Sequence, residues 1–328
     1  MKALICDDYG PPEKLKIVDL PEPIPGEGEA LIEVGFAGLN FFDLLVIENK
    51  YQAKPPLPFS PSAEFSGRVL ALGPGAKGFA PGDRVLGYAG FGSAREKLVC
   101  PVEKLLPIPA GLSDEKAAGI TITYGTTLHA LKQRADLKSG ESLVVLGASG
   151  GVGLAAVELG ARLGARVIAC ASSDEKLKFV RAFGAAETIN YATSDLRAEL
   201  KRLTSGRGAD IVYDPVGGPL TEQALRSLAW KGRLLVIGFA SGEIPKPPLN
   251  LALLKGCDIR GVFWGEFLNR EPEAHRENMA ELLADAASGA ISAHVHAVYP
   301  LASYVEALGV IARREALGKV ILKIGRGA

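Results

Sequence analysis

The sequence predicts an α/β protein with two domains, one rich in β-strands and one built on a doubly wound parallel sheet. Its 328 residues exceed what a single ordinary hydrophobic core accommodates and suit two domains. Short β-type runs separated by Gly and Pro turns fill residues 1–110. From residue 140 onward, apolar strands alternate with amphipathic helices, which is typical of a parallel sheet covered on both faces.

The elements expected in the first part of the chain are short. Strands are predicted at residues 31–34, 67–72 and 83–86, and their spacing favours a compact, partly barrel-like β region. The pattern of short β-type runs ends at Ser113. Ser113 precedes Asp, Glu and Lys and is expected to cap the start of a helix.

The second part alternates strand and helix, and the tail returns to β texture. Two C-terminal strands, at 295–299 and 319–324, are expected to rejoin the N-terminal domain. The predicted strands of the alternating region are 142–146, 166–170, 187–189, 210–214, 232–238 and 258–263, and the predicted helices are 152–163, 174–183, 196–203, 220–228 and 273–288.

Composition excludes several classes of protein. A hydrophobic fraction of 48% excludes global disorder, and 37 basic against 37 acidic residues exclude a chain-wide cationic field for nucleic acid. The N-terminus has no signal-peptide pattern, and no apolar run approaches the ~18 residues of a membrane span. We therefore expect a soluble, cytoplasmic protein. The four widely spaced cysteines are expected to be small buried hydrophobes rather than disulfides or zinc ligands.

The most specific motif is Gly-Ala-Ser-Gly-Gly-Val-Gly at residues 147–153, directly after an apolar strand and at the start of a helix. It is a dinucleotide-binding fingerprint with Ala148 in place of the first Gly. Gly150 would let the backbone approach a pyrophosphate, and Gly153 would let the helix pack on the strand. The helix N-terminus would offer free N–H groups to the phosphates. The predicted contacts are Ser149, Gly150, Gly151, Val152 and Gly153.

The end of the second strand indicates which dinucleotide binds. NAD-binding folds place an acidic residue there for the ribose 2′-hydroxyl, but this sequence has Ala171. Ser172, Ser173 and Lys176 follow and suit a 2′-phosphate, so NADPH is favoured over NADH. A structural interpretation is compatible with this one, in which Ser173 or Asp174 caps a helix and Lys176 is a surface charge.

Nearly the whole chain resembles the zinc-independent quinone oxidoreductases, the zeta-crystallin-like branch of the medium-chain dehydrogenase/reductase superfamily. Besides the glycine loop, the matching motifs lie at residues 38–43, 51–59, 61–67, 81–85 and 318–322. The resemblance implies a GroES-like catalytic domain interrupted by a Rossmann domain, with the active site in the cleft between them. The implied limits are 1–122 for the first part of the catalytic domain, 123–264 for the Rossmann domain and 265–328 for the return.

The resemblance also argues against zinc. Zinc-dependent relatives hold the metal with Cys, His and a third Cys or acidic ligand, and these positions fall on Asn40, Ala63 and Ile122. None of the three is a normal zinc ligand. Glu64 remains, but one carboxylate is not a metal site, and the cysteine lobe of a structural zinc is missing.

Without zinc, a reductase needs a hydrogen-bond donor for the acceptor oxygen. Asn40, at the first vacated metal position, and Tyr51 are the catalytic candidates; Asn40 could instead cap a loop and Tyr51 could be a packing residue. Asp43 is expected to be structural. Close quinone reductases often carry Tyr where this chain has Leu45 and Gly where it has Ser62. The loss of the Tyr at position 45 is expected to make the acceptor pocket more apolar, which weakens the expectation that the acceptor is a quinone.

The resemblance places further cofactor contacts at the carboxyl ends of strands, where such sheets bind ligands. Thr126 is expected on the nicotinamide side and Tyr191 near the adenosine phosphate. Phe263 and Trp264 could instead be core or interface aromatics. The remaining implied contacts are Val216, Gly217, Phe239, Ala240, Ser241 and Val262, with Asn250 and Lys319 as weaker candidates.

The implied function is NADPH-dependent, zinc-independent reduction of quinones or related activated acceptors by hydride transfer. The alternatives are 1,4-reduction of enones or enoyl thioesters, and a non-catalytic NADPH-binding protein of crystallin-like or RNA-binding type. The expected partners are a small-molecule electrophile and a second copy of the chain, because the apolar last strand of the Rossmann sheet would otherwise be an exposed edge. No membrane partner is expected, and zero net charge disfavours nucleic acid.

Overall fold

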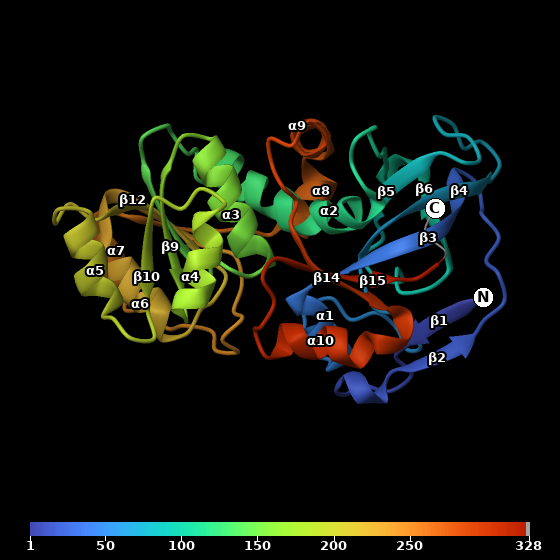
Figure 1. Ribbon diagram of the computed structural model, residues 1–328, viewed down its shortest axis with the longest axis horizontal. Helices are drawn as coiled ribbons and strands as arrows, with labels where there is room; N and C mark the ends of the chain where they lie inside the picture. Colours follow the sequence, from blue (N-terminus) through green and yellow to red (C-terminus); the bar gives the residue numbers. More distant parts are fainter. Residues whose placement is uncertain (326–328) are drawn as a thin grey trace. The chain divides into compact units, whose positions relative to one another are not determined.

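The computed structural model describes residues 1–325 and divides into two compact units (Figure 1). The first unit comprises Met1–Ile122 and the chain from Glu281 onward, and the second comprises Thr123–Ala280. Within residues 1–325, no helix is both long and apolar enough to cross a membrane. All four cysteines are buried and free.

A seven-stranded sheet organises the first unit. Its path runs β14-β15-β3-β4-β5-β7, and β6 pairs with β3 off this path. The C-terminal strand β15 pairs antiparallel with β3, with Val320 opposite Leu39, so the tail of the chain completes the N-terminal sheet. The strands are β3 (Glu29–Leu39), β4 (Glu64–Leu72), β5 (Arg84–Tyr88), β6 (Lys97–Pro101), β7 (Leu105–Pro107), β14 (Val295–Pro300) and β15 (Lys319–Lys323); β1 (Lys2–Ile5) and β2 (Lys16–Asp19) form a separate pair.

Two helices cover this sheet next to each other, α1 (Phe41–Ile47) and α10 (Tyr304–Ala312), as Figure 1 shows. Their apolar side chains, including Ile47 and Leu308, share one core with Phe59 and Leu322. A third helix, α2 (Asp114–His129), begins where Ser113 was expected to cap it, and the Ser113 hydroxyl accepts from the Lys116 N–H at 3.5 Å. Short 3-10 helices are η1 (Pro12–Lys14), η2 (Val102–Lys104) and η4 (Leu301–Ser303).

The second unit contains a six-stranded, fully parallel sheet. Its strand order reverses direction between the central strands β8 and β11, which is the order of a dinucleotide-binding Rossmann sheet. β8 is buried along its whole length because helices cover both faces. The order across the sheet is β10 (Glu187–Asn190), β9 (Arg166–Ala171), β8 (Ser142–Leu146), β11 (Ala209–Asp214), β12 (Leu228–Val236) and β13 (Asp258–Gly261).

The helices that connect these strands begin at caps visible in the sequence. The Ser173 hydroxyl accepts from the Lys176 N–H, and the Asp195 carboxylate accepts from the Ala198 N–H. The helices are α3 (Gly151–Arg162), α4 (Asp174–Arg181), α5 (Leu196–Leu203), α6 (Pro219–Arg226), α7 (Asn250–Lys255), α8 (Trp264–Arg270) and α9 (Pro272–Ser288), with a π-helix η3 (Ala130–Arg134) after α2.

The structure differs from the expected domain limits at the second boundary. Residues 265–280 belong to the second unit rather than to the return segment. Phe267 stacks on His129 with ring centroids 3.9 Å apart, and Gln133 and Asn278 exchange hydrogen bonds of 3.1 Å. These contacts hold α8 and the first part of α9 against residues of the second unit, and the expected strand at 258–263 ends at Gly261.

Candidate functional site

The glycine loop lies between β8 and α3 and has the geometry of a phosphate cradle. Gly150 is the N-cap of α3 and provides no side chain to its first turn. A β-carbon at Gly150 would contact only the Gly147 carbonyl oxygen, at 3.7 Å, whereas one at Gly153 would lie 2.2 Å from that oxygen. Gly153 therefore allows α3 to pack on the loop, and Gly150 keeps the approach to the helix N-terminus open.

Polar side chains gather at the end of the neighbouring strand β9. The Lys176 ammonium donates to the Ser172 hydroxyl at 3.3 Å, and Ser173 caps α4. The nearest acid in sequence, Asp174, accepts from the Asn190 amide at 2.8 Å. Tyr191 follows β10, and its N–H donates to the Ala171 carbonyl at 3.1 Å. The structure therefore brings Ser172, Ser173 and Lys176 together beside the strand that leads to Tyr191.

The loops after β11 and β12 are joined by hydrogen bonds. One oxygen of buried Asp214 accepts from the N–H groups of Val216 and Gly217, each at 2.9 Å. The Ser241 N–H donates to the Val216 carbonyl at 2.8 Å, so the two loops form one surface. The predicted residues on this surface are Val216, Gly217, Phe239, Ala240 and Ser241.

The third group of predicted residues follows β13. The Val262 N–H donates to the Val236 carbonyl at 3.0 Å, and Phe263 is 63% exposed. Trp264 is buried, and its indole would lie 3.0 Å from a β-carbon at Gly125, which precedes Thr126 in α2. Trp264 is thus a core aromatic beside Thr126, which was one of the two interpretations of its role.

A second group of polar residues lies buried in the first unit. The Lys319 ammonium donates to the Asn40 side-chain oxygen at 2.6 Å and forms a salt bridge with Glu64. The Asn40 amide N–H₂ group donates to the same Glu64 oxygen at 2.9 Å, and the other Glu64 oxygen accepts from the Ile122 N–H at 2.9 Å. Both ends of the Asn40 amide are therefore engaged inside the unit, which favours a structural role over direct contact with an acceptor.

Asp43 extends this cluster. Its carboxylate accepts from the Asn40 N–H at 2.7 Å at the start of α1. Burial raises the pKa of Asp43 from 3.8 to about 7, even though the N–H groups of Asn40 and Ser62 and the charge of Lys319 act in the opposite direction. Asp43 is thus a buried carboxyl group that changes charge near neutral pH.

Two phenols lie within electrostatic range of Asp43. Half-buried Tyr51 stacks on Phe42, with ring centroids 5.4 Å apart and 28° between the ring planes. Burial and then the Asp43 charge raise the pKa of Tyr51, and burial raises the pKa of Tyr88 to about 12. No hydrogen bond within residues 1–325 uses the Tyr51 hydroxyl, so this neutral phenol can donate to a ligand.

Comparison with known proteins identifies the family. Residues 26–110 match the alcohol dehydrogenase GroES-like domain, and residues 151–285 match the zinc-binding dehydrogenase domain. Quinone oxidoreductase-like protein 2 of Rattus norvegicus is 37% identical over 324 residues, which cover 98% of this chain and 92% of the relative. Quinone oxidoreductase of Pseudomonas aeruginosa is 33% identical, with 96% and 97% covered.

The chain belongs to the quinone oxidoreductase branch of the medium-chain dehydrogenase/reductase superfamily. Members of this branch are oxidoreductases. The solved structure of Escherichia coli quinone oxidoreductase complexed with NADPH has a TM-score of 0.92 and 28% identity, covering 98% of this chain and all of that one. The family identification also confirms the GroES-like and Rossmann assignments made from the sequence.

One of the matching domains is named for zinc binding, which raises the question of whether this chain has residues that could bind zinc. Among residues 1–325, no group of three or more His, Cys, Asp or Glu side chains is placed to hold a metal ion. The Asn40 and Glu64 oxygens face the Lys319 ammonium, and a zinc ion there would meet its positive charge. The residues present do not fit a catalytic zinc ion.

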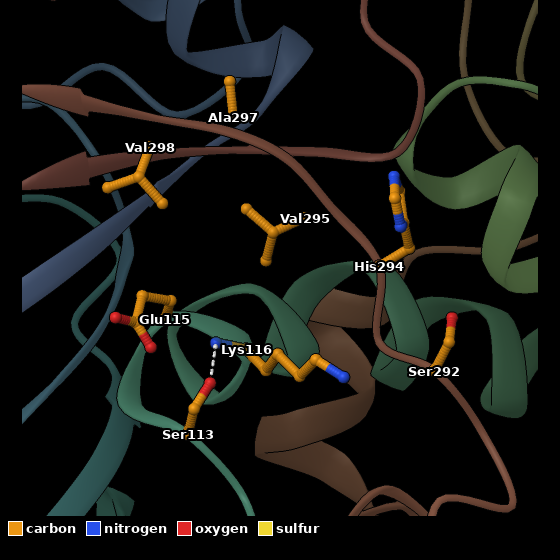
Figure 2. A pocket seen from close by; sticks show the side chains of 8 residues that line it. All are labelled: Ser113, Glu115, Lys116, Ser292, His294, Val295, Ala297 and Val298. Atoms are coloured by element: carbon orange, nitrogen blue, oxygen red, sulfur yellow. Dashed lines mark hydrogen bonds between the residues drawn. The ribbon is translucent and has the colours of Figure 1, made fainter.

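A separate cavity of about 390 Å³ opens in the first unit between the start of α2 and residues 292–298. Figure 2 shows Glu115 and Lys116 on one side of it and His294 on the other. None of the residues predicted for catalysis or cofactor binding lines this cavity.

Sequence reasoning missed the central residue of the buried cluster. Lys319 was only a weak cofactor candidate, yet it is 4% exposed and lies on Asn40 and Glu64. Tyr88 was not singled out at all. The sequence signal for Lys319 was a charge at the start of an apolar strand, where a buried charge needs a partner. Tyr88 lies directly opposite Glu64 in the sheet, which only the strand pairing reveals.

Proposed function

We propose that this protein is an NADPH-dependent reductase that transfers hydride to a quinone or a related activated acceptor without a metal ion. The observation that carries the proposal is the open glycine cradle at the N-terminus of α3, in a sheet of dinucleotide-binding order. The NADPH in the E. coli quinone oxidoreductase structure supports the same cofactor here.

The residues of the second unit fit NADPH. The α3 N-terminus would hold the pyrophosphate, because Gly150 places no side chain in its way. Ser172, Ser173 and Lys176 would hold the 2′-phosphate, since they offer two hydroxyls and one positive charge and the strand ends without an acid. The joined loops carrying Val216, Gly217, Phe239, Ala240 and Ser241, together with Thr126, Tyr191, Val262 and Phe263, would complete the site. Trp264, predicted as a further contact, is buried against Gly125 and would support Thr126 instead of touching NADPH.

NADPH supplies a hydride from its nicotinamide when bound. Negative charge then develops on the acceptor oxygen, and a hydrogen-bond donor directed at that oxygen stabilises it. We assign this donor to the Tyr51 hydroxyl, whose raised pKa keeps it protonated. Asn40 is assigned a supporting role, because both ends of its amide are already engaged. Solvent supplies the proton that completes the two-electron reduction.

The acceptor class is quinone or enone. Phe42 and Leu45 are both half-buried on α1, and the Phe42 ring stacks on Tyr51. An acceptor bound at the Tyr51 hydroxyl would therefore have apolar side chains beside it. Apolar surroundings suit the ring of a quinone and the carbon skeleton of an enone equally, so turnover must choose between the two.

We also propose a homodimer. β13 is the last strand of its sheet, and large apolar side chains are exposed on it and on the neighbouring β12, Ile259 at 39% and Trp230 at 69%. Pairing two β13 edges across a two-fold axis would cover them. Light scattering at micromolar concentration should give about twice 34.4 kDa, and a mass of 34.4 kDa would refute the dimer. Cytoplasmic localisation stays a prediction from the sequence.

The proposed function is tested by following NADPH oxidation against 1,4-benzoquinone, 9,10-phenanthrenequinone, an alkenal and crotonyl-CoA, with NADH in parallel. We expect NADPH-preferring turnover that survives EDTA and falls in the Tyr51→Phe variant. The Tyr304→Phe variant is the control, since that phenol already donates to the Leu15 carbonyl at 2.5 Å, outside the loop that carries Tyr51. Tight NADPH binding without turnover of any acceptor would favour a non-catalytic role instead.

A further inference from the structure

We infer that Lys319 is a positioning residue for the proposed reduction: its buried ammonium group fixes Asn40, and through helix α1 it fixes the Phe42 ring on which Tyr51 stacks. This inference rests on the proposed function, in which Tyr51 donates to the acceptor. All the residues involved belong to the first unit.

The ammonium group is buried and has two acceptors, on Asn40 and Glu64. The Lys319 and Glu64 side chains are 5% and 0% exposed, and the ammonium also donates to Asn40 at 2.6 Å. Removing such charges from water is strongly unfavourable unless partners compensate. Apolar side chains filling the same space would often stabilise the fold equally well or better, so stability alone does not account for this buried pair.

The backbone around the pair is shaped to admit it. A β-carbon at Gly119 in α2 would lie 2.6 Å from the Lys319 Cγ atom, so the lysine stem passes where an ordinary side chain would stand. A β-carbon at Gly38 would lie 2.9 Å from the Glu64 Oε1 atom and 2.4 Å from the Ala118 carbonyl oxygen. Two glycines on different elements thus leave room for one ammonium–carboxylate pair.

Asn40 transmits this position to the helix. It is the N-cap of α1, its N–H donates to Asp43 at 2.7 Å, and its carbonyl accepts from the Asp43 N–H at 3.1 Å. Since Lys319 and Glu64 hold the Asn40 side chain, they set where the first turn of α1 begins. Phe42 is the second residue of that turn, and its ring lies 5.4 Å from Tyr51.

The test must separate positioning from plain structural support. Lys319→Met alone would leave the Glu64 carboxylate buried and unpaired, so the informative variant is Lys319→Met with Glu64→Gln, which removes both charges. Its matched control is Lys97→Met with Glu22→Gln, a salt bridge of the same residue types at the surface of the same unit. Gly119→Ala is a milder variant that keeps both charges and displaces the lysine stem.

The first readout needs no turnover. The protein is labelled with 3-fluorotyrosine, and the ¹⁹F resonance of Tyr51 is assigned from its loss in Tyr51→Phe. We expect this resonance to shift in Lys319→Met/Glu64→Gln and in Gly119→Ala and to stay unchanged in the surface control. An unchanged Tyr51 resonance in both variants would overturn the inference, whether or not the protein reduces any acceptor. If the doubly substituted protein does not fold, Gly119→Ala alone decides.

The second readout is a kinetic cycle with Tyr51→Phe. We expect Lys319→Met/Glu64→Gln to lower kcat for the acceptor roughly tenfold with an unchanged NADPH Kd, and to have little further effect when Tyr51 is already Phe. Equal losses in both backgrounds would show that Lys319 does not act through Tyr51 and would overturn the inference. Full activity of Tyr51→Phe would instead contradict the proposed role of Tyr51, so the two failures are distinguishable.

Discussion

A β-carbon on Gly153 would lie 2.2 Å from the carbonyl oxygen of Gly147, so the first turn of α3 sits directly on the loop that follows β8. This contact brings the N–H groups of the helix to the carboxyl end of the central strand. Gly150 lies between the two residues and leaves that end open. Packing and phosphate binding therefore depend on different glycines of the same motif.

This separation predicts opposite phenotypes for two Gly→Ala variants. Gly153→Ala forces α3 away from β8 and should lower the free energy of unfolding by about 2–3 kcal/mol in urea denaturation. Gly150→Ala meets only a 3.7 Å contact and should fold normally but bind NADPH roughly tenfold more weakly. Gly35→Ala in β3, where a β-carbon would meet only the Ser66 carbonyl oxygen at 3.7 Å, is the control outside the proposed site. Equal loss of stability in the first two variants would contradict the separation.

Lys176 should distinguish NADPH from NADH. In the Lys176→Gln variant, NADPH Kd should rise about tenfold. A charge-assisted hydrogen bond to the 2′-phosphate contributes about 1.5–3 kcal/mol, and solvent screening reduces this contribution. NADH Kd should not change. Lys178→Gln, on an exposed position of the same helix, should leave both constants unaltered. Fluorescence titration with each dinucleotide measures the four values, and a parallel loss of NADH affinity would contradict a role at the 2′-phosphate.

Asp43 should make the stability of the protein depend on pH. The carboxyl group of Asp43 has a pKa of about 7 in the folded protein and of about 3.8 in the unfolded chain. Its contribution to the free energy of unfolding is therefore greatest below pH 3.8 and is lost as the pH rises to 7. The Asp43→Asn variant lacks this titration. Thermal melts from pH 5 to 8 should show its Tm rising relative to wild type as pH increases. A constant difference in Tm would show that Asp43 is already ionised.

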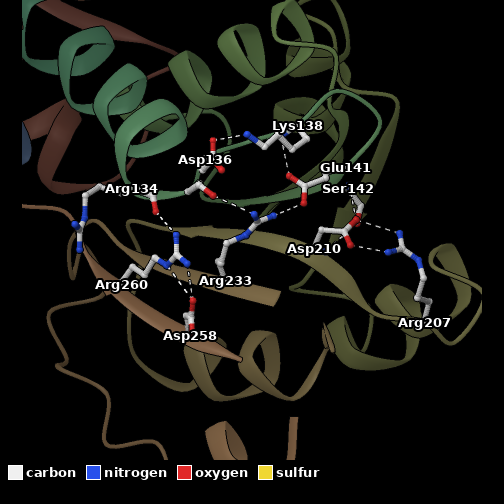
Figure 3. Close-up of polar contacts among 11 residues, drawn as sticks. Arg134, Asp136, Lys138, Glu141, Ser142, Arg207, Asp210, Arg233, Asp258 and Arg260 are labelled. Carbon is white, nitrogen blue, oxygen red and sulfur yellow. Dashed lines mark hydrogen bonds and ion pairs between the residues drawn. The ribbon is translucent and has the colours of Figure 1, made fainter. Parts of the chain in front are cut away.

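Asp210 should have the opposite dependence. Burial acts to raise its pKa, but the hydrogen bonds from Arg207 at 2.6 Å and from Ser142 at 2.7 and 2.8 Å outweigh burial and lower the pKa to about 2. Figure 3 shows Asp210 between these two partners. The stability that ionised Asp210 adds to the folded protein is therefore present above about pH 3.8 and is lost as the pH falls toward 2.

Asp210→Asn should therefore cost about 1–3 kcal/mol of unfolding free energy at pH 7 and much less near pH 2. Urea titrations at several pH values measure both quantities. Asp258→Asn is the comparison, because its ion pair with Arg260 is more exposed and should contribute under about 1 kcal/mol. A pH-independent loss in Asp210→Asn would contradict the assigned pKa.

The sequence was most informative where the signal was local. The strand Ser142–Leu146 was predicted with its observed bounds, because five consecutive apolar or small residues end at a glycine loop. Helices α7 and α8 were not predicted, since six and seven residues are too short for a helical period to show. The strand β12 begins at Leu228, earlier than expected, because Lys231 and Gly232 interrupt its apolar pattern.

The buried cluster shows the other limit of sequence reasoning. Asn40 could be singled out from a family motif, but its partner Lys319 is 279 residues away, and Lys319 was grouped with the cofactor site. Only the pairing of β15 with β3 brings the two strands together. Contacts of this kind depend on sheet order, which residue patterns within one segment do not encode.

The most direct test of metal-free hydride transfer is a single-turnover stopped-flow measurement on protein whose zinc content has been shown by mass spectrometry to be negligible. The protein is mixed with NADPH or with NADPH deuterated at C4, and then with the acceptor that turns over fastest. We predict the same rate before and after chelation, and a slower rate with deuterium. A rate that falls on chelation and returns with added zinc would contradict the account, and so would the absence of NADPH oxidation with every acceptor.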